Sequence, residues 1–185
     1  MLHMEQKDFK AEIVLELLKA ENHVRGIAKA LNTNHMNISR KIKELYKENI
    51  VDYREEGKNK KYFLKKTSEA KIYVSIAENY KLLRVLEKYP SLRTIIEKIQ
   101  NNNKVKMAIL FGSYAKGLAK QDSDIDIYID TEDKKLKHEL EPIDSKLSIK
   151  IGRFDKDNLL IKEIIKNHVV LKGVEEYYGE VKFFS

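Results

Sequence analysis

Apolar and polar positions follow the period of a helix in the first third of the chain and then switch to the period of a strand. Apolar residues recur every three or four positions in three segments, which predicts helices over residues 8–20, 23–32 and 35–49. Residues 50–56 and 61–67 are instead rich in β-branched and aromatic side chains, and a Gly/Asn turn separates them. This second pattern predicts a β-hairpin.

The third predicted helix has one apolar face and one polar face. We expect the apolar face to point inward, and it is made of Met36, Ile38, Ile42 and Leu45. The polar face carries amides, a hydroxyl and positive charges, and we expect it to meet solvent or a ligand. Its residues are Asn34, His35, Asn37, Ser39, Arg40, Lys41 and Lys43.

Beyond residue 67 the pattern predicts two helices and then alternating strands and helices. We expect a long helix that Ser68 caps and Pro90 ends, and a second helix up to residue 103. A nearly continuous apolar run and two alternating runs follow, as buried and half-buried strands would. The predicted strands cover residues 105–112, 123–130 and 146–154, and helices are predicted at 134–142 and 158–168.

Composition and charge narrow the class of protein. The length of 185 residues is enough for one medium domain or two small ones, and the 42% of hydrophobic residues is enough to form a core. Cysteine is absent, so disulfides and thiolate metal sites are excluded. No apolar run is long enough to cross a bilayer, and we expect a soluble, cytoplasmic protein with no membrane partner. The net charge of +7 is concentrated in residues 1–67, where Lys and Arg outnumber Asp and Glu by 15 to 10.

Three helices followed by a hairpin is the order of a winged helix-turn-helix, and residues 8–66 resemble winged-helix transcriptional regulators. The resemblance implies that the polar face of the third helix enters the major groove of double-stranded DNA. Lys58 and Lys60 in the hairpin turn would then reach a neighbouring phosphate. A protein-docking role is the alternative. Such regulators usually bind as dimers, so residues 69–88 are a candidate homodimer seam, with packing onto the second domain as the alternative.

A Gly-Ser turn precedes two acidic residues in the second half of the chain. Asp124 and Asp126 lie two positions apart on a predicted strand, so both carboxylates project from the same face. They repel each other, and a hard cation such as Mg²⁺ would relieve that repulsion while binding phosphate oxygens. Gly112 allows close approach of the backbone, and the Ser113 hydroxyl with nearby N–H groups can hold a triphosphate.

Gly-Ser, ten residues and then Asp-x-Asp resembles the nucleotidyltransferase superfamily of DNA polymerase β, and residues 100–172 look like its minimal nucleotidyltransferase domains. The resemblance implies a mixed β-sheet with helices and an NTP, ATP first, as substrate or ligand. It implies Mg²⁺ or Mn²⁺ as the metal. Several members adenylylate an all-helical HEPN-type toxin, which makes such a protein a candidate partner.

The same resemblance assigns roles to individual residues. Gly112 and Ser113 would bind the nucleotide, and Asp124 and Asp126 would be catalytic and hold the metal. Lys116 either reaches a phosphate or is a solvated lysine.

One residue of the family pattern is missing. Active members carry a third carboxylate on a later strand, which here is the strand predicted at 146–154. Its polar positions are Ser148 and Lys150, and neither is a metal ligand of the usual kind. The acids nearby, Asp144, Asp155 and Asp157, fall in flanking loops.

These observations predict an α+β chain of three parts. A winged helix-turn-helix DNA-binding domain covers 1–67, a helical connector 68–103 and a minimal nucleotidyltransferase domain 104–185. One function is a nucleotidyltransferase that uses NTP and Mg²⁺, with antitoxin-like protein adenylylation as one form, coupled to DNA binding. The other is a catalytically impaired domain that serves as nucleotide sensor or docking module of a transcriptional regulator. Histidines such as His168 lack metal-ligand spacing, and we expect them at the surface or at its boundary.

Overall fold

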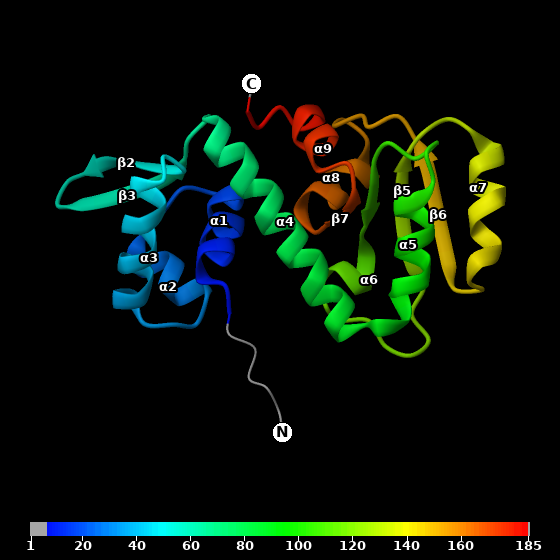
Figure 1. Cartoon of the computed structure of the whole chain (residues 1–185), viewed down its shortest axis with the longest axis horizontal. Coiled ribbons are helices and arrows are strands. Elements are labelled where there is room, and N and C mark those ends of the chain that lie inside the picture. Colours follow the sequence, from blue (N-terminus) through cyan, green and yellow to red (C-terminus); the bar gives the residue numbers. More distant parts are fainter. Residues whose placement is uncertain (1–6, 185) are drawn as a thin grey trace. The chain divides into compact units, whose positions relative to one another are not determined.

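The computed structural model describes residues 7–184 of the chain (Figure 1). It separates into two compact units, residues 1–77 and residues 78–185, and helix α4 (Ser68–Lys88) runs across the boundary. The predicted connector at 68–103 is therefore divided between the two units. Within the described residues, no helix combines the length and the apolar character needed to cross a membrane.

The first unit contains three helices followed by a hairpin, as the pattern predicts. A very short strand, β1 (Asn22–His23), also pairs with β3 and completes an antiparallel sheet of order β1-β3-β2. This is the topology of a winged helix-turn-helix domain. The other elements are α1 (Phe9–Lys19), α2 (Val24–Ala30), α3 (His35–Lys47), β2 (Val51–Glu56) and β3 (Asn59–Leu64).

Polar side chains and one glycine fix the local structure of this unit. The Asp8 carboxylate caps α1 by accepting from two backbone N–H groups, and the Asn34 amide oxygen caps α3 by accepting from the Met36 N–H at 2.8 Å. The hairpin turn contains Gly57 with φ +61°, a left-handed conformation in which a Cβ atom is unfavourable.

The inward face of α3 agrees with the prediction except at one residue. Ile38, Ile42 and Leu45 are at most 1% exposed, whereas Met36 is 66% exposed. The prediction of Met36 as a core residue is wrong because successive helical residues are about 100° apart. Two positions therefore separate Met36 from Ile38 by about 200°, and Met36 lies on the opposite face of the helix.

The second unit is built on a mixed four-stranded sheet of order β6-β5-β4-β7. Strands β5 and β6 are parallel, and β4 is antiparallel to both β5 and β7. The strands are β4 (Ala108–Leu110), β5 (Ile125–Asp130), β6 (Leu147–Gly152) and β7 (Val169–Lys172). The helices are α5 (Arg93–Asn101), α6 (Gly112–Ala115), α7 (Lys134–Leu140), α8 (Leu159–Lys166) and α9 (Val174–Glu180), with 3₁₀ turns at Pro90–Leu92 and Glu141–Ile143.

Both faces of this sheet are covered by side chains from helices. On one face, α5 and α7 pack on apolar residues of all four strands, including Ile127 and Ile129 of β5 (Figure 1). On the other face, Tyr128 packs edge-on against Phe154, which in turn packs against Tyr177 of α9, with ring centroids 6.1 and 5.8 Å apart. The second face of β5 is thus closed at Tyr128.

Two local predictions are corrected here. The residue that caps α4 is Thr67 rather than Ser68, because the Thr67 hydroxyl accepts the Ala70 N–H at 3.2 Å. The strand predicted at 105–112 is regular only over Ala108–Leu110.

Candidate functional site

Strand β5 places both candidate metal ligands at its open beginning. Asp126 is the second residue of the strand, and Asp124 directly precedes the strand. Their neighbours Ile125 and Ile127 are at most 3% exposed on the opposite face, so the alternation of the sequence is an alternation of faces. The Asp124 side chain is exposed and Asp126 is half-buried.

The Gly-Ser turn lies directly against one of these carboxylates. Gly112 has φ +69°, and a Cβ atom added there would lie 2.4 Å from Asp126 Oδ2. Only a residue without a side chain fits this contact. The turn is also tied to β5 through its backbone, because the Phe111 N–H donates to the Asp126 carbonyl at 2.9 Å. Ser113 directly follows Gly112 in the sequence and belongs to the short helix α6.

The environment of Asp126 disfavours its negative charge. Burial raises the pKa of the Asp126 carboxyl and the adjacent Asp124 raises it further, while the Lys150 charge and a hydrogen bond with the Ser148 side chain act in the opposite direction. The net shift is upward. A cation between the two carboxylates would remove the cause of their mutual repulsion.

The parallel neighbour of β5 supplies no third acid. In the register of the two strands, Asp126 is paired with Ser148 and Tyr128 with Lys150. Asp144 and Asp155 instead accept backbone N–H groups in their own turns, at 2.8 and 2.9 Å. Over residues 7–184, no group of three or more His, Asp or Glu side chains is arranged to hold a metal ion.

The donor set at β5 therefore fits one divalent cation better than two. Mg²⁺ commonly binds through one or two carboxylates and completes its shell with phosphate oxygens and water. Asp124 and Asp126 provide these two carboxylates. Two-cation sites hold their ions about 4 Å apart, and their mutual repulsion requires further negative ligands that this strand pair does not offer.

Lys116 has a protein partner at the edge of this site. Its ammonium donates to Glu163 Oε1 of α8 at 2.9 Å, and both side chains are substantially exposed. A role on a phosphate would require Lys116 to exchange this carboxylate for the ligand, and that role stays a prediction.

On the first unit, α3 divides the predicted DNA-contacting residues into an open group and an engaged group. Arg40 and Lys43 are exposed on the side of the helix that carries Met36, and the Arg40 guanidinium donates to Asn37 Oδ1 at 3.3 Å. Lys41 is instead half-buried, and its ammonium lies 3.1 Å from Glu44 Oε2. Asn34 is occupied as the cap of the helix. His35 is exposed, whereas Asn37 and Ser39 are half-buried.

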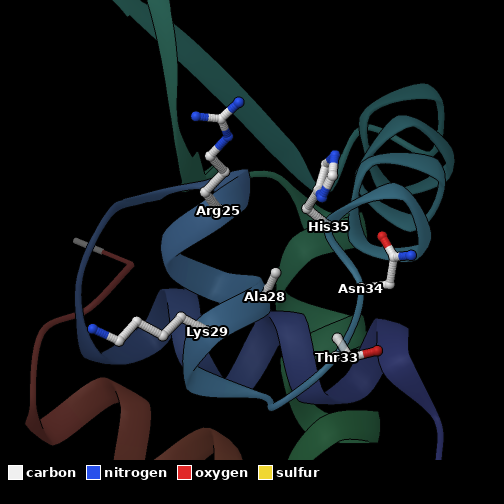
Figure 2. Close-up of a pocket in the computed structure, with 6 residues that line it drawn as sticks. All are labelled: Arg25, Ala28, Lys29, Thr33, Asn34 and His35. Atoms are coloured by element: carbon white, nitrogen blue, oxygen red, sulfur yellow. The ribbon is translucent and has the colours of Figure 1, made fainter.

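An open depression lies beside the start of α3 (Figure 2). Its cationic side chains, Arg25 and Lys29, come from α2, and the imidazole of His35 comes from α3. Ala28, Thr33 and Asn34 complete the lining. Sequence reasoning missed Arg25 and Lys29, although their spacing of four residues places them on one face of the second helix.

The two hairpin lysines that were predicted to contact phosphate, Lys58 and Lys60, have different surroundings. Lys58 is exposed in the turn. The Lys60 ammonium lies 3.8 Å from the centroid of the Tyr53 ring, a cation–π contact that holds the side chain over β2. Lys58 is therefore the freer of the two predicted phosphate contacts.

A buried polar cluster in the second unit was also missed, and His168, which was expected at the surface or at its boundary, is half-buried beside it. The His168 side chain is 12% exposed, and its Nε2 lies 3.6 Å from Oε1 of Glu78, which is 1% exposed. This distance is long for a hydrogen bond, so the contact is an ion pair when the imidazole is protonated. The Tyr178 hydroxyl donates to the same Oε1 at 2.8 Å. Because these polar groups pair with one another away from solvent, we assign the cluster to stability.

Comparison with known proteins identifies the family of the second unit. Residues 93–176 match the model of the family described as "Polymerase beta, Nucleotidyltransferase", so this unit contains a nucleotidyltransferase domain of that type. The match confirms the resemblance inferred from the Gly-Ser and Asp-x-Asp spacing. None of the curated proteins matches the chain.

Two solved structures show weaker similarity to the chain. The adhesin competence repressor (AdcR) from Streptococcus pyogenes has 20% identity and a TM-score of 0.37, over 52% of this chain and 78% of that chain. The homodimeric winged helix-turn-helix DNA-binding domain Mb0332 from Mycobacterium bovis, described as a possible ArsR-family transcriptional regulator, has 22% identity and a TM-score of 0.30. That match covers 48% of this chain and 94% of that chain. The winged-helix assignment rests on the topology of the first unit.

Proposed function

We propose that the chain is a DNA-binding protein whose nucleotidyltransferase domain binds a nucleoside triphosphate, ATP as the first candidate, with Mg²⁺ or Mn²⁺. The observation that carries the proposal is the contact between Gly112 and Asp126, where a side chain of any size would collide with the carboxylate. This contact brings the turn that carries Ser113 next to the strand that carries Asp126, which supports a common site for a metal–triphosphate ligand.

Each residue of this site has a distinct part in the proposal. Asp124 and Asp126 would hold the cation, and Ser113 with backbone N–H groups of its turn would bind phosphate oxygens. When bound, the cation neutralises charge on the phosphates and on the two carboxylates. Gly112 keeps the turn close enough to the strand for both sets of ligands to reach one triphosphate.

The first unit would bind double-stranded DNA through the exposed stripe of α3. Arg40 and Lys43 are exposed and would contact base edges or phosphates, and the depression lined by Arg25, Lys29 and His35 offers further contacts to the DNA backbone. Lys58 in the hairpin turn would contact a neighbouring phosphate. We also propose that the chain acts as a homodimer on a two-fold symmetric site, which light scattering of the protein–DNA complex would test.

Transfer of the nucleotide to an acceptor is the second candidate function. The complete Gly-Ser and Asp-x-Asp pair favours it, and the missing third carboxylate speaks against it. In such a transfer, a hydroxyl oxygen of the acceptor bonds to the α-phosphorus, the bond between the α-phosphorus and the bridging oxygen breaks, and pyrophosphate leaves. The hydroxyl proton passes to water. A hydroxyl of a partner protein, such as a HEPN-type toxin, would be the acceptor.

One pair of measurements separates the two candidates. Calorimetric titration with ATP and Mg²⁺ should show binding to the natural chain and its loss in Asp124→Asn/Asp126→Asn, while Asp157→Asn, which changes an exposed loop acid, should bind normally. Incubation with ATP labelled at the α-phosphate, alone and with cell lysate, then reports transfer. Binding without transfer of label supports the nucleotide-binding regulator, and label lost in the double variant supports the enzyme. Normal ATP affinity in the double variant would refute the proposed site.

A further inference from the structure

The open face next to Asp126 carries a positive charge from the neighbouring strand. Strand β6 runs parallel to β5, and its residues Ser148 and Lys150 are register partners of Asp126 and Tyr128. Residues two apart on a strand share a face, so these four side chains project from the same side of the sheet. Tyr128 is closed off by its packing on Phe154. The part that stays open therefore combines two carboxylates, one hydroxyl and one ammonium.

Lys150 is placed to act on this site. Its side chain is exposed, and its charge is among the groups that act on the Asp126 carboxylate. Among the residues that the structure describes, no hydrogen bond or ion pair is found that would hold the ammonium elsewhere. A lysine stem spans the distance between successive same-face positions of adjacent strands, so the ammonium can reach ligand phosphates that are bound at Asp126.

The balance of charge at this point is different from that of a site for two divalent ions. Two such ions bring four positive charges to within about 4 Å of each other and need several shared carboxylates to hold them. Here Ser148 stands where the adjacent strand could have offered an acid beside Asp126. Lys150 adds a positive charge that repels a second ion and attracts phosphate.

We propose that Lys150 takes the place of a second metal ion, so that the domain binds a nucleoside triphosphate with a single divalent cation held by Asp124 and Asp126. This inference rests on the proposed nucleotide site and defines its metal content. Lys150 acts as a fixed cation on the phosphates, and Ser148 leaves the second ion without a ligand. Because the carboxylates bind the metal and Lys150 binds the phosphates, replacing Lys150 should affect the two ligands in opposite ways. Loss of the ammonium should strengthen the binding of the metal alone and weaken the binding of the nucleotide.

The test measures bound Mn²⁺ by electron paramagnetic resonance of the full-length protein, with and without saturating α,β-methylene-ATP, which binds as a triphosphate but cannot release pyrophosphate. The natural chain should hold one Mn²⁺ per bound nucleotide. Lys150→Met should bind Mn²⁺ alone about tenfold more tightly and the nucleotide about tenfold more weakly. Lys150→Arg should resemble the natural chain, and Lys162→Met, an exposed lysine of α8, is the matched control.

A gain of metal gives the sharper result. Ser148→Asp combined with Lys150→Met adds a carboxylate beside Asp126 and removes the competing charge, so we expect a second Mn²⁺ per bound nucleotide. Circular dichroism spectra of each variant confirm that it is folded. Two Mn²⁺ ions per nucleotide in the natural chain would overturn the inference, and so would a Lys150→Met variant with unchanged affinities for both ligands. If the natural chain binds neither Mn²⁺ nor the analogue, the proposed function itself fails and this inference fails with it.

Discussion

The two units of the chain build their candidate sites in opposite ways. In the first unit, most predicted contacts come from one helix, and neighbouring turns of α3 place Arg40 and Lys43 on its exposed side. In the second unit, the site joins Gly112, Asp126 and Lys150, which come from a turn and two strands. A site on one helix survives as long as the helix is folded. A site joined across strands depends on register, so a small displacement of one strand separates its parts.

The largest expected loss of stability comes from a substitution in the core that packs against the inward face of α3. Ile38 is 0% exposed on the inward face of α3, and we expect Ile38→Ala to lower the free energy of unfolding of the first unit by about 4 kcal/mol. Met36→Ala, two positions away on the exposed face, should change it by less than about 0.5 kcal/mol. Urea unfolding followed by circular dichroism measures both. Equal losses in the two variants would contradict the orientation of α3.

Acid should weaken the second unit through Glu78. Burial alone would raise the pKa of this carboxyl, but His168, Lys81 and Tyr178 outweigh it and lower the pKa to about 2 from 4.5. Because the pKa is lower in the folded state than in the unfolded state, the charged carboxylate stabilises the fold, and this stabilisation is complete at pH values above the pKa of the unfolded state. We therefore expect the free energy of unfolding to fall by about 3 kcal/mol as the pH falls from 4.5 towards 2.

Replacement of this carboxylate tests the assignment. Glu78→Gln should flatten the pH dependence of urea unfolding in this acid range, because it removes the titrating group. Glu163→Gln is the control: Glu163 lies beside Lys116 at the surface, so its replacement should leave the acid profile almost unchanged. An acid profile of Glu78→Gln that matches the natural chain would show that other carboxylates cause the loss.

Each unit contains a glycine with positive φ, and replacing the two glycines compares the candidate site with the hairpin turn. Gly112 and Gly57 both have positive φ, but a Cβ at Gly112 would meet Asp126 Oδ2 at 2.4 Å, whereas nothing lies within 4 Å at Gly57. Gly57→Ala should cost about 1 kcal/mol of backbone strain, and Gly112→Ala about 2 kcal/mol because the carboxylate must also move. Gly112→Ala should in addition abolish ATP binding in calorimetry. Full ATP affinity in that variant would show that the contact at Asp126 is not part of a nucleotide site.

The same contrast explains what could be predicted from the sequence. Helical and strand periods are local, so the helices of the first unit, its hairpin and the two faces of β5 all follow from spacing. The Gly-Ser and Asp-x-Asp spacing even indicated the family. Met36 is the local exception, because an apolar side chain need not be buried and its angle around the helix places it opposite Ile38.

Other features depend on contacts between distant parts of the chain. Glu78 and His168 meet across ninety residues of sequence, and no local pattern marks either as buried. The partner of Lys116 is set by the packing of α8, and the facing of Lys150 is fixed only when β6 is paired in parallel with β5. Sequence spacing indicates which residues could form the candidate site, and strand register determines which of them adjoin Asp126.

The smallest expected effect tests whether α3 reads DNA at all. Arg40 and Lys43 are exposed, so each should contribute one contact to DNA, whereas the ammonium of Lys41 is 3.1 Å from Glu44 and should contribute little. We expect Arg40→Ala and Lys43→Ala each to weaken binding of a short mixed-sequence duplex by about 1 kcal/mol. Each substitution should also make the negative slope of log affinity against log salt less steep by about 1, because binding with one phosphate contact fewer releases one counterion fewer. Fluorescence anisotropy between about 50 and about 200 mM salt measures both quantities. If Lys41→Ala reduces the slope as much as Lys43→Ala does, the ion pair with Glu44 opens on DNA, and the stripe that reads DNA is wider than the exposed face of the free helix.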